Sequence, residues 1–208
     1  MKKGNTETGR IRRLPPGPHG IPPELVERNQ RERLVAAMAE VCAEVGYGSA
    51  TVAEVTRCAG VSTASFYRQF EDKRACMLAS FGELFGRLLG ELERACAEEA
   101  ELGAKAKAGI HTAAVLLAGD LPTARLLALE IVAVGTEGVR LQQEAIDGLA
   151  TRLREARGQA SGALPSLPTP EWVAVVAAVA MVARRCAAGE RLDPTELEAV
   201  VSAVAAPL

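Results

Sequence analysis

The chain has few aromatic residues, few histidines and no long hydrophobic segment. Phe, Trp and Tyr make up 3% of its 208 residues, although hydrophobic residues make up 49%. The hydrophobic residues are mainly Ala and Leu, which favour helices over sheets. The longest apolar run, 173–183, is shorter than the ~20 residues that cross a bilayer, and the polar, basic first twenty residues do not resemble a secretory signal. We therefore expect an all-α cytoplasmic protein without a membrane-spanning segment.

Motifs for metal binding, disulfides and catalysis are also missing. The five cysteines are scattered singly and the two histidines, His19 and His111, are far apart. An odd number of isolated cysteines is typical of a reduced protein without a disulfide framework or a structural zinc. The sequence has no Glu-x-x-His pair, nucleophile elbow or phosphate loop. We therefore expect no enzyme activity, catalytic residue, metal or cofactor.

The charge is unevenly distributed along the chain. Residues 1–80 carry 12 Lys and Arg against 9 Asp and Glu, a net charge of +3, whereas residues 81–208 carry 12 against 17, a net charge of −5. A basic first part with an acidic remainder predicts that a polyanion binds only the first part.

Helix boundaries are clearest between residues 51 and 70. Thr51 and Glu54 have the spacing of a capping box, in which a Thr hydroxyl accepts from the N3 amide and a Glu reaches back. Gly60 is suited to the left-handed conformation that ends a helix, and Ser62 can cap the next one. The segment 51–70 therefore predicts a helix, a tight turn and a second helix.

The second of these helices has two different faces. Phe66 and Phe70 are four residues apart and should point together into a core. The opposite face suits the major groove of DNA, because it carries small, hydroxyl and guanidinium groups; it consists of Thr63, Ala64, Tyr67 and Arg68. The start of this helix, with Ser62, is favourable for a phosphate. Lys73 opposes the dipole of the following helix, which a phosphate would also offset.

The segments 46–55 and 59–73 resemble the N-terminal signature of the TetR family of transcriptional regulators. The resemblance covers a glycine-aromatic pair, a capping Thr, the turn Ala59-Gly60-Val61-Ser62, Phe66-Tyr67, Phe70 and Lys73. It implies phosphate contacts by Thr51, Ser62 and Lys73, and contacts at or near bases by Thr63, Ala64, Tyr67 and Arg68. Two positions depart from the family pattern. Gln69 stands where His or Tyr is usual, so the contact with the DNA backbone commonly made at this position is not carried over. Thr56 stands where Ala is usual.

Residues 1–21 are basic and rich in Pro and Gly, which predicts a disordered basic arm. The arm either follows the DNA backbone or minor groove, or is a solvated tail. The resemblance implies a three-helix helix-turn-helix domain at 22–73 and a helical effector-binding and dimerisation domain at 74–208. Apolar spacing predicts that the first helix begins at Pro22 and ends at Gly46, with one apolar stripe along it, consisting of Leu25, Leu34, Met38, Val41, Cys42 and Val45.

A long helix should run from Asp72 to about Ala100, and the segment 161–170 should be a loop. Further helices are expected at about 104–118, 122–135, 136–158, with Val139 and Ile146 facing inward, and at 171–188 and 193–204. The last two, including Val201, should form a four-helix bundle with a partner subunit; an ordinary core within one chain is the alternative.

Residues that line the effector pocket are harder to predict. Helix faces suggest Phe81, Phe85, His111, Arg140, Gln142 and Trp172. Because few aromatic residues follow Lys73, an aliphatic or acyl-like effector is favoured over a polyaromatic drug. Gly82, Gly86 and Gly90 recur every four residues on the helix after Asp72; they serve either close approach of a neighbour or a helix that bends easily.

The sequence thus predicts a homodimeric repressor that binds a palindromic operator in double-stranded DNA and is released by a small-molecule effector. Two alternatives remain. One is a helix-turn-helix regulator that senses redox through Cys76 or Cys96, or has no ligand. The other is a small helical enzyme or carrier.

Overall fold

The computed structural model describes residues 22–158 and 169–205, and the side chains up to residue 203. The arm at 1–21 and most of the loop expected at 161–170 lie outside the described residues. Within these ranges the chain is entirely helical, without strands, as the sequence predicts. The elements are α1 (Pro23–Ser49), α2 (Val52–Ala59), α3 (Thr63–Gln69), α4 (Lys73–Ala97), α5 (Leu102–Gly119), α6 (Leu121–Ala128), the 3₁₀ helix η1 (Glu130–Val134), α7 (Thr136–Ala156), α8 (Pro170–Ala188) and α9 (Pro194–Ala205).

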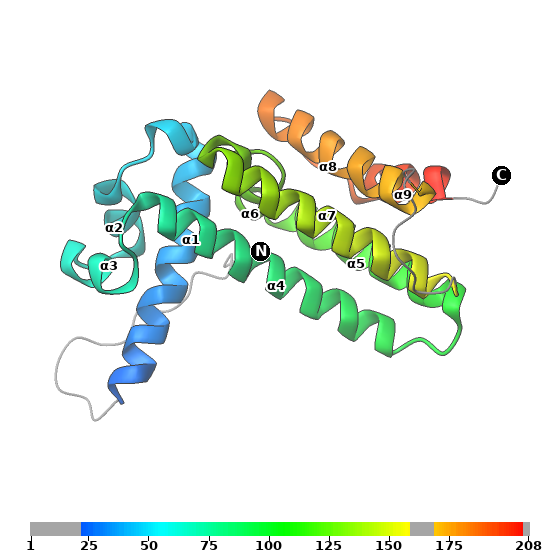
Figure 1. Ribbon diagram of the computed structural model, residues 1–208, viewed down its shortest axis with the longest axis horizontal. Helices are drawn as coiled ribbons and strands as arrows, with labels where there is room; N and C mark the ends of the chain where they lie inside the picture. The colour runs from blue at the N-terminus through cyan, green and yellow to red at the C-terminus, as the bar shows by residue number, and fades with distance from the viewer. Residues whose placement is uncertain (1–21, 159–168, 206–208) are drawn as a thin grey trace, which may run out of the picture.

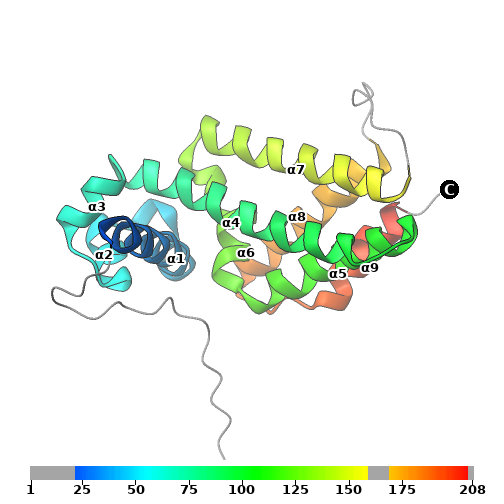
Figure 2. The same ribbon diagram turned by 90° about the horizontal axis from the view of Figure 1, so that it is seen from below.

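The arrangement places α2 and α3 at one end of the molecule and the start of α5 and α9 toward the other (Figure 1, Figure 2). Helix α4 follows α3 directly and runs from the first region into the second. Helix α5 packs along α4, which also contacts α6 and α7, and α8 packs against α6, α7 and α9. Within the described residues, no helix combines the length and apolar character needed to cross a bilayer.

The predicted capping signals are confirmed. The Thr51 hydroxyl accepts from the Glu54 N–H, and the Glu54 carboxylate accepts from the Thr51 N–H at 2.9 Å. Gly60 ends α2 with φ 61° and ψ 41°, the left-handed conformation that glycine tolerates best. Ser62 accepts from the Ser65 N–H and Asp72 from the Ala75 N–H, so α3 and α4 are capped in the same way.

Helix α1 differs from its prediction at both ends. Leu34, Met38 and Cys42 are buried, but Leu25 and Val45 of the predicted apolar stripe are exposed. The backbone leaves the helical conformation at Gly46, with φ 75° and ψ 154°, before one more short turn. The stripe was predicted over the whole helix, but its first turns extend beyond the neighbouring helices that cover its middle.

The segment predicted as one helix from Pro122 to about Gly135 is divided. Helix α6 ends at Ala128 and the chain continues as η1. At the junction Leu129 has φ −122° and ψ −53°, and Glu130 turns into the interior. Helical periodicity alone could not predict this division, because one of the residues that Glu130 contacts lies far away in the sequence. In α7, Ile146 is buried as expected, whereas Val139 is exposed.

The first helices and the later ones share a hydrophobic core. Leu34 and Met38 of α1, Phe66 of α3 and Met77 of α4 belong to the same buried cluster as Leu126 of α6. The boundary expected after residue 73 is therefore a boundary in sequence and not a gap in packing. A displacement of α6 would therefore also change the packing around α1, because tightly packed side chains leave few voids between the two helices.

Candidate DNA-binding surface and ligand cavity

Helix α3 presents the two faces that its sequence predicts. Phe66 and Phe70 are 0% and 5% exposed, with ring centroids 5.6 Å apart. Tyr67 is 56% exposed, and Thr63, Ala64 and Arg68 are exposed on the same outward side. The Arg68 guanidinium donates to the Ser65 hydroxyl at 2.9 Å, which holds it close to α3. The exposed face of α3 is therefore polar and accessible to a large partner, and the buried Phe66 and Phe70 hold it in place from the opposite side.

The turn between α2 and α3 is fixed from below by α1. The Arg33 guanidinium donates to the carbonyl oxygens of Ala59 and Gly60, the last residues before the turn. Arg31 lies over the Phe70 ring, 4.7 Å from its centroid, and pairs with Glu83 of α4. These contacts set the angle of α3 relative to α1 and α4.

Lys73 has partners within the protein that its sequence position did not reveal. Its ammonium donates to the carbonyl oxygens of Tyr47 and Ala50, each at 2.8 Å, and lies 4.4 Å from the centroid of the Tyr47 ring. These carbonyls offset a positive charge at a helix start without a phosphate. The Lys73 charge at the start of α4 therefore does not require a phosphate nearby. The phosphate contact of Lys73 remains a prediction from resemblance alone.

A cavity of about 760 Å³ lies among α4–α9. This volume is within the range of roughly 300–1,000 Å³ typical of small-molecule sites. Most of its lining is aliphatic, with Phe81 and Phe85 stacked at 5.8 Å along one wall. The charged lining residues come from the end of α4, the start of α5 and the end of α7, which meet on the side away from α2 and α3 (Figure 2); they are Glu93, Lys105, Arg152 and Glu155. The cavity thus has a long apolar part and one charged end.

Half of the predicted pocket residues line this cavity. Phe81, Phe85 and Gln142 do so. His111 instead contacts Glu198 on the surface, with 2.8 Å between Nδ1 and Oε1.

The other two predicted residues have partners elsewhere. Arg140 is exposed and pairs with Glu144. Trp172 packs against Ile146 and Val175 and donates to Asp147 at 2.8 Å. Helical periodicity gave these two residues an inward face but could not distinguish the cavity from other packing.

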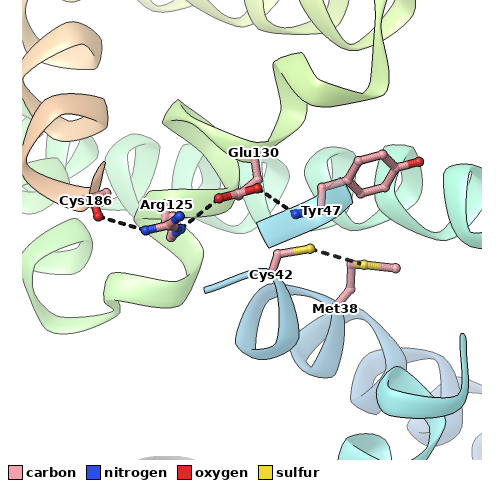
Figure 3. Close-up of polar contacts among 6 residues, drawn as sticks. All are labelled: Met38, Cys42, Tyr47, Arg125, Glu130 and Cys186. Carbon is pink, nitrogen blue, oxygen red and sulfur yellow. Dashed lines mark hydrogen bonds and ion pairs between the residues drawn. The ribbon is translucent and has the colours of Figure 1, made fainter. Parts of the chain in front are cut away.

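Sequence reasoning missed a buried polar group that joins the two halves of the chain. The Glu130 carboxylate, 6% exposed, accepts the Tyr47 backbone N–H at 2.8 Å and the Arg125 Nε–H at 2.8 Å. Arg125 also donates to the Cys186 carbonyl oxygen near the end of α8 at 2.8 Å (Figure 3). A Glu in an amphipathic helix normally lies on the solvent-exposed side, and nothing in the neighbouring sequence marks Glu130 as a buried residue.

The same group affects the buried thiols nearby. Burial, with a further contribution from the negative charge of Glu130, raises the pKa of Cys42 to about 12. Burial likewise raises the pKa of Cys76 to about 12. Both thiols therefore remain protonated near neutral pH, and thiolate is the form that reacts with oxidants. In the described part of the chain, no three His, Cys, Asp or Glu side chains are grouped so as to hold a metal.

The comparison with family models matches the helical hairpin and its surroundings. Residues 34–79 match the model described as bacterial regulatory proteins, tetR family. This segment is therefore similar to bacterial regulatory proteins of the tetR family. The match extends from the buried middle of α1 through α3 into the first turns of α4, the region in which the sequence resemblance was found.

Solved structures of two regulators match most of the length of this chain. The fatty acid degradation regulator FadR from Bacillus halodurans has a TM-score of 0.68 and 20% identity, over 86% of this chain and 96% of that one. FadR from Bacillus subtilis, solved in complex with stearoyl-CoA, has a TM-score of 0.66 and 21% identity, over 85% and 98%. At these identities the likeness concerns the fold.

A curated relative supports the same grouping over a shorter stretch. The fatty acid metabolism regulator protein of Bacillus subtilis (strain 168) is 30% identical over 105 residues, which is 50% of this chain. The match spans about half the length of that relative, 54%.

The structure differs from the expected dimer interface at Val201 of α9. Val201 is buried against Ala174 within the chain and is therefore not a free interface residue. Four of the exposed residues of α8 form a separate stripe at helical spacing, namely Val173, Ala180, Arg184 and Ala187. This stripe, with its small central Ala180, is the face of α8 that another helix can approach closely.

Proposed function

We propose that this chain is a homodimeric transcriptional repressor that binds a palindromic DNA operator through α3 and is released by a long-chain acyl ligand. The observation that supports DNA binding most strongly is the exposed face of α3, held by Arg33 and the buried Phe66 within a TetR-type hairpin. We expect it to act in the cytoplasm, where a bacterial DNA operator lies, and no step of the proposal requires catalysis.

The acyl ligand is favoured by the chemistry of the cavity. An aliphatic chain suits the Leu, Ala and Val lining, and its burial stabilises the complex by about 25 cal/mol per Å² of apolar surface. The charged end, where Arg152 lies 3.6 Å from Glu93 and Lys105 is close by, suits a polar head group. The stearoyl-CoA complex of the structurally similar FadR from Bacillus subtilis suggests an acyl thioester as the first ligand to test.

A dimer would place two copies of α3 on successive turns of DNA. Two-fold helix-turn-helix dimers read half-sites about 34–36 Å apart, in adjacent major grooves. The exposed stripe of α8 provides a face for such a dimer, because three of its four residues are Val or Ala and leave room for another helix to pack closely.

Two linked measurements test this proposal. DNA fragments bound by the protein should be selected from a random pool, and we expect a palindrome that binds at least a thousandfold more tightly than scrambled DNA. Stearoyl-CoA should then release the protein from this operator, while CoA without an acyl chain should not. Failure to select any sequence would reject the DNA-binding proposal, and selection without release would reject the acyl ligand only.

A further inference from the structure

The bend at the end of α1 creates a backbone donor that needs a partner. Because Gly46 is not helical, the Tyr47 N–H is removed from the regular hydrogen-bond ladder of α1. A buried backbone N–H without a partner costs about 1–3 kcal/mol. The Glu130 carboxylate satisfies this donor from η1, and the Cβ position of Gly46 would be 3.8 Å from one of its oxygens.

Tyr47 is also fixed on its other side by the start of α4. The Lys73 ammonium holds the carbonyl oxygens of Tyr47 and Ala50, and Thr51 then begins the cap of α2. The peptide groups of Tyr47 therefore connect η1 on one side with α4 on the other. A change in the Glu130 contact would change the path by which the chain enters the α2–α3 hairpin.

Helix α6, which carries the Arg125 partner of Glu130, also forms part of the cavity wall. Helix α6 lines the cavity with Ala124, Leu127 and Ala128, while Arg125 between them pairs with Glu130. The Gln142 amide lines the same cavity and donates to the carbonyl oxygens of Leu127 and Ala128, at 3.1 and 3.0 Å. A ligand against this wall would press on the last turn of α6, two residues before Glu130.

We propose that the Glu130–Tyr47 hydrogen bond is the contact that couples the cavity to the DNA-binding hairpin: it is present in the DNA-binding arrangement and is lost when a ligand displaces the end of α6. This inference rests on the proposed function and specifies its regulation. A ligand that binds more tightly to the displaced arrangement lowers the population of the other one, and DNA does the reverse.

The first test is hydrogen exchange at the Tyr47 amide of the full-length wild-type protein. Saturation with stearoyl-CoA should accelerate exchange of this amide at least tenfold, with little change in buried amides of α1 such as that of Met38. Unchanged protection of Tyr47 in a protein that stearoyl-CoA releases from its operator would overturn the inference and leave the proposed function intact.

The second test removes the polar pair together. Arg125→Met with Glu130→Met leaves no buried unpaired charge and retains apolar volume, a type of replacement that folded proteins often tolerate. Its ligand-free operator affinity should fall at least tenfold toward that of the ligand-saturated wild type, and stearoyl-CoA should lower it by less than threefold more. Arg74→Met with Glu137→Met is the matched control, because it removes an exposed pair between α4 and α7 and should keep the wild-type response.

Two further outcomes are covered by this design. If the Met pair does not fold, the exchange of the wild-type Tyr47 amide decides alone. If stearoyl-CoA does not bind, the acyl proposal is wrong, and Ala128→Phe takes the place of the ligand by filling the cavity from α6. Faster Tyr47 exchange in this variant would support the coupling, and wild-type protection would overturn it.

Discussion

Glu130 and Tyr47 are 83 residues apart in sequence, yet the carboxylate of the first accepts the backbone N–H of the second at 2.8 Å. The contact joins the end of α1 to the short helix after α6, beside the hydrophobic core that both regions share. It links η1, which follows the cavity-lining helix α6, to the segment of chain that leads into the α2–α3 hairpin.

Phe70→Ala should destabilise the protein without touching the exposed face of α3. Phe70 is buried against Phe66, so truncation removes a large apolar side chain and leaves a cavity, at a cost of about 3–5 kcal/mol. Chemical unfolding measures this loss. Tyr67→Ala is the control and should change the free energy of unfolding by less than about 1 kcal/mol; equal losses in the two variants would mean that the faces are misassigned.

The dimer interface can be tested at Ala180, which is exposed on α8. Ala180→Glu should yield folded monomers in sedimentation, because a long charged side chain would replace the small residue at the centre of the interface and prevent close helix packing. Ala97→Glu, at the exposed end of α4, should remain dimeric. A dimer of unchanged affinity in Ala180→Glu would exclude this stripe as the interface.

The glycine stripe of α4 allows a clean test of helix bending. A Cβ at Gly82, Gly86 or Gly90 would meet no atom within 4 Å, so close approach of a neighbour within the chain does not explain these glycines. Gly86→Ala should therefore raise the stability by up to about 1 kcal/mol. If α4 bends during release, this variant should also need more stearoyl-CoA to leave the operator; higher stability with an unshifted release curve would exclude a role for bending.

The reactivity of the cysteines distinguishes a redox-sensing regulator from a ligand-sensing one. With a pKa of about 12, the Cys76 thiol is ionised to only about one part in 10⁴ at pH 8. Disulfide reagents should therefore modify Cys42 and Cys76 only after unfolding, and peroxide should leave these two thiols unoxidised in the folded protein. Cys96 lines the cavity, so stearoyl-CoA should slow its alkylation. Rapid peroxide-dependent loss of DNA binding would favour the redox alternative.

The sequence predicted those features that depend on neighbouring residues. The caps at Thr51 and Ser62, the turn at Gly60 and the inward position of Phe66 all follow from residues within one or two helical turns. The contacts of Glu130 and Lys73 could not be predicted in this way, because their partners are fixed only by the packing of distant helices. The same limit applies to the cavity. Phe81 lies on its wall as predicted, whereas Trp172 packs elsewhere, and helical periodicity could not distinguish the two cases.

The most direct test of the account compares operator and scrambled DNA affinities for the wild type, Tyr67→Ala and Arg68→Ala. Both side chains are exposed on α3, so each truncation should weaken operator binding by about 1–3 kcal/mol. Arg87→Ala, an exposed arginine on α4, serves as the control and should bind like the wild type. The account predicts that the preference for operator over scrambled DNA falls in the two α3 variants alone; an unchanged preference in both would contradict it.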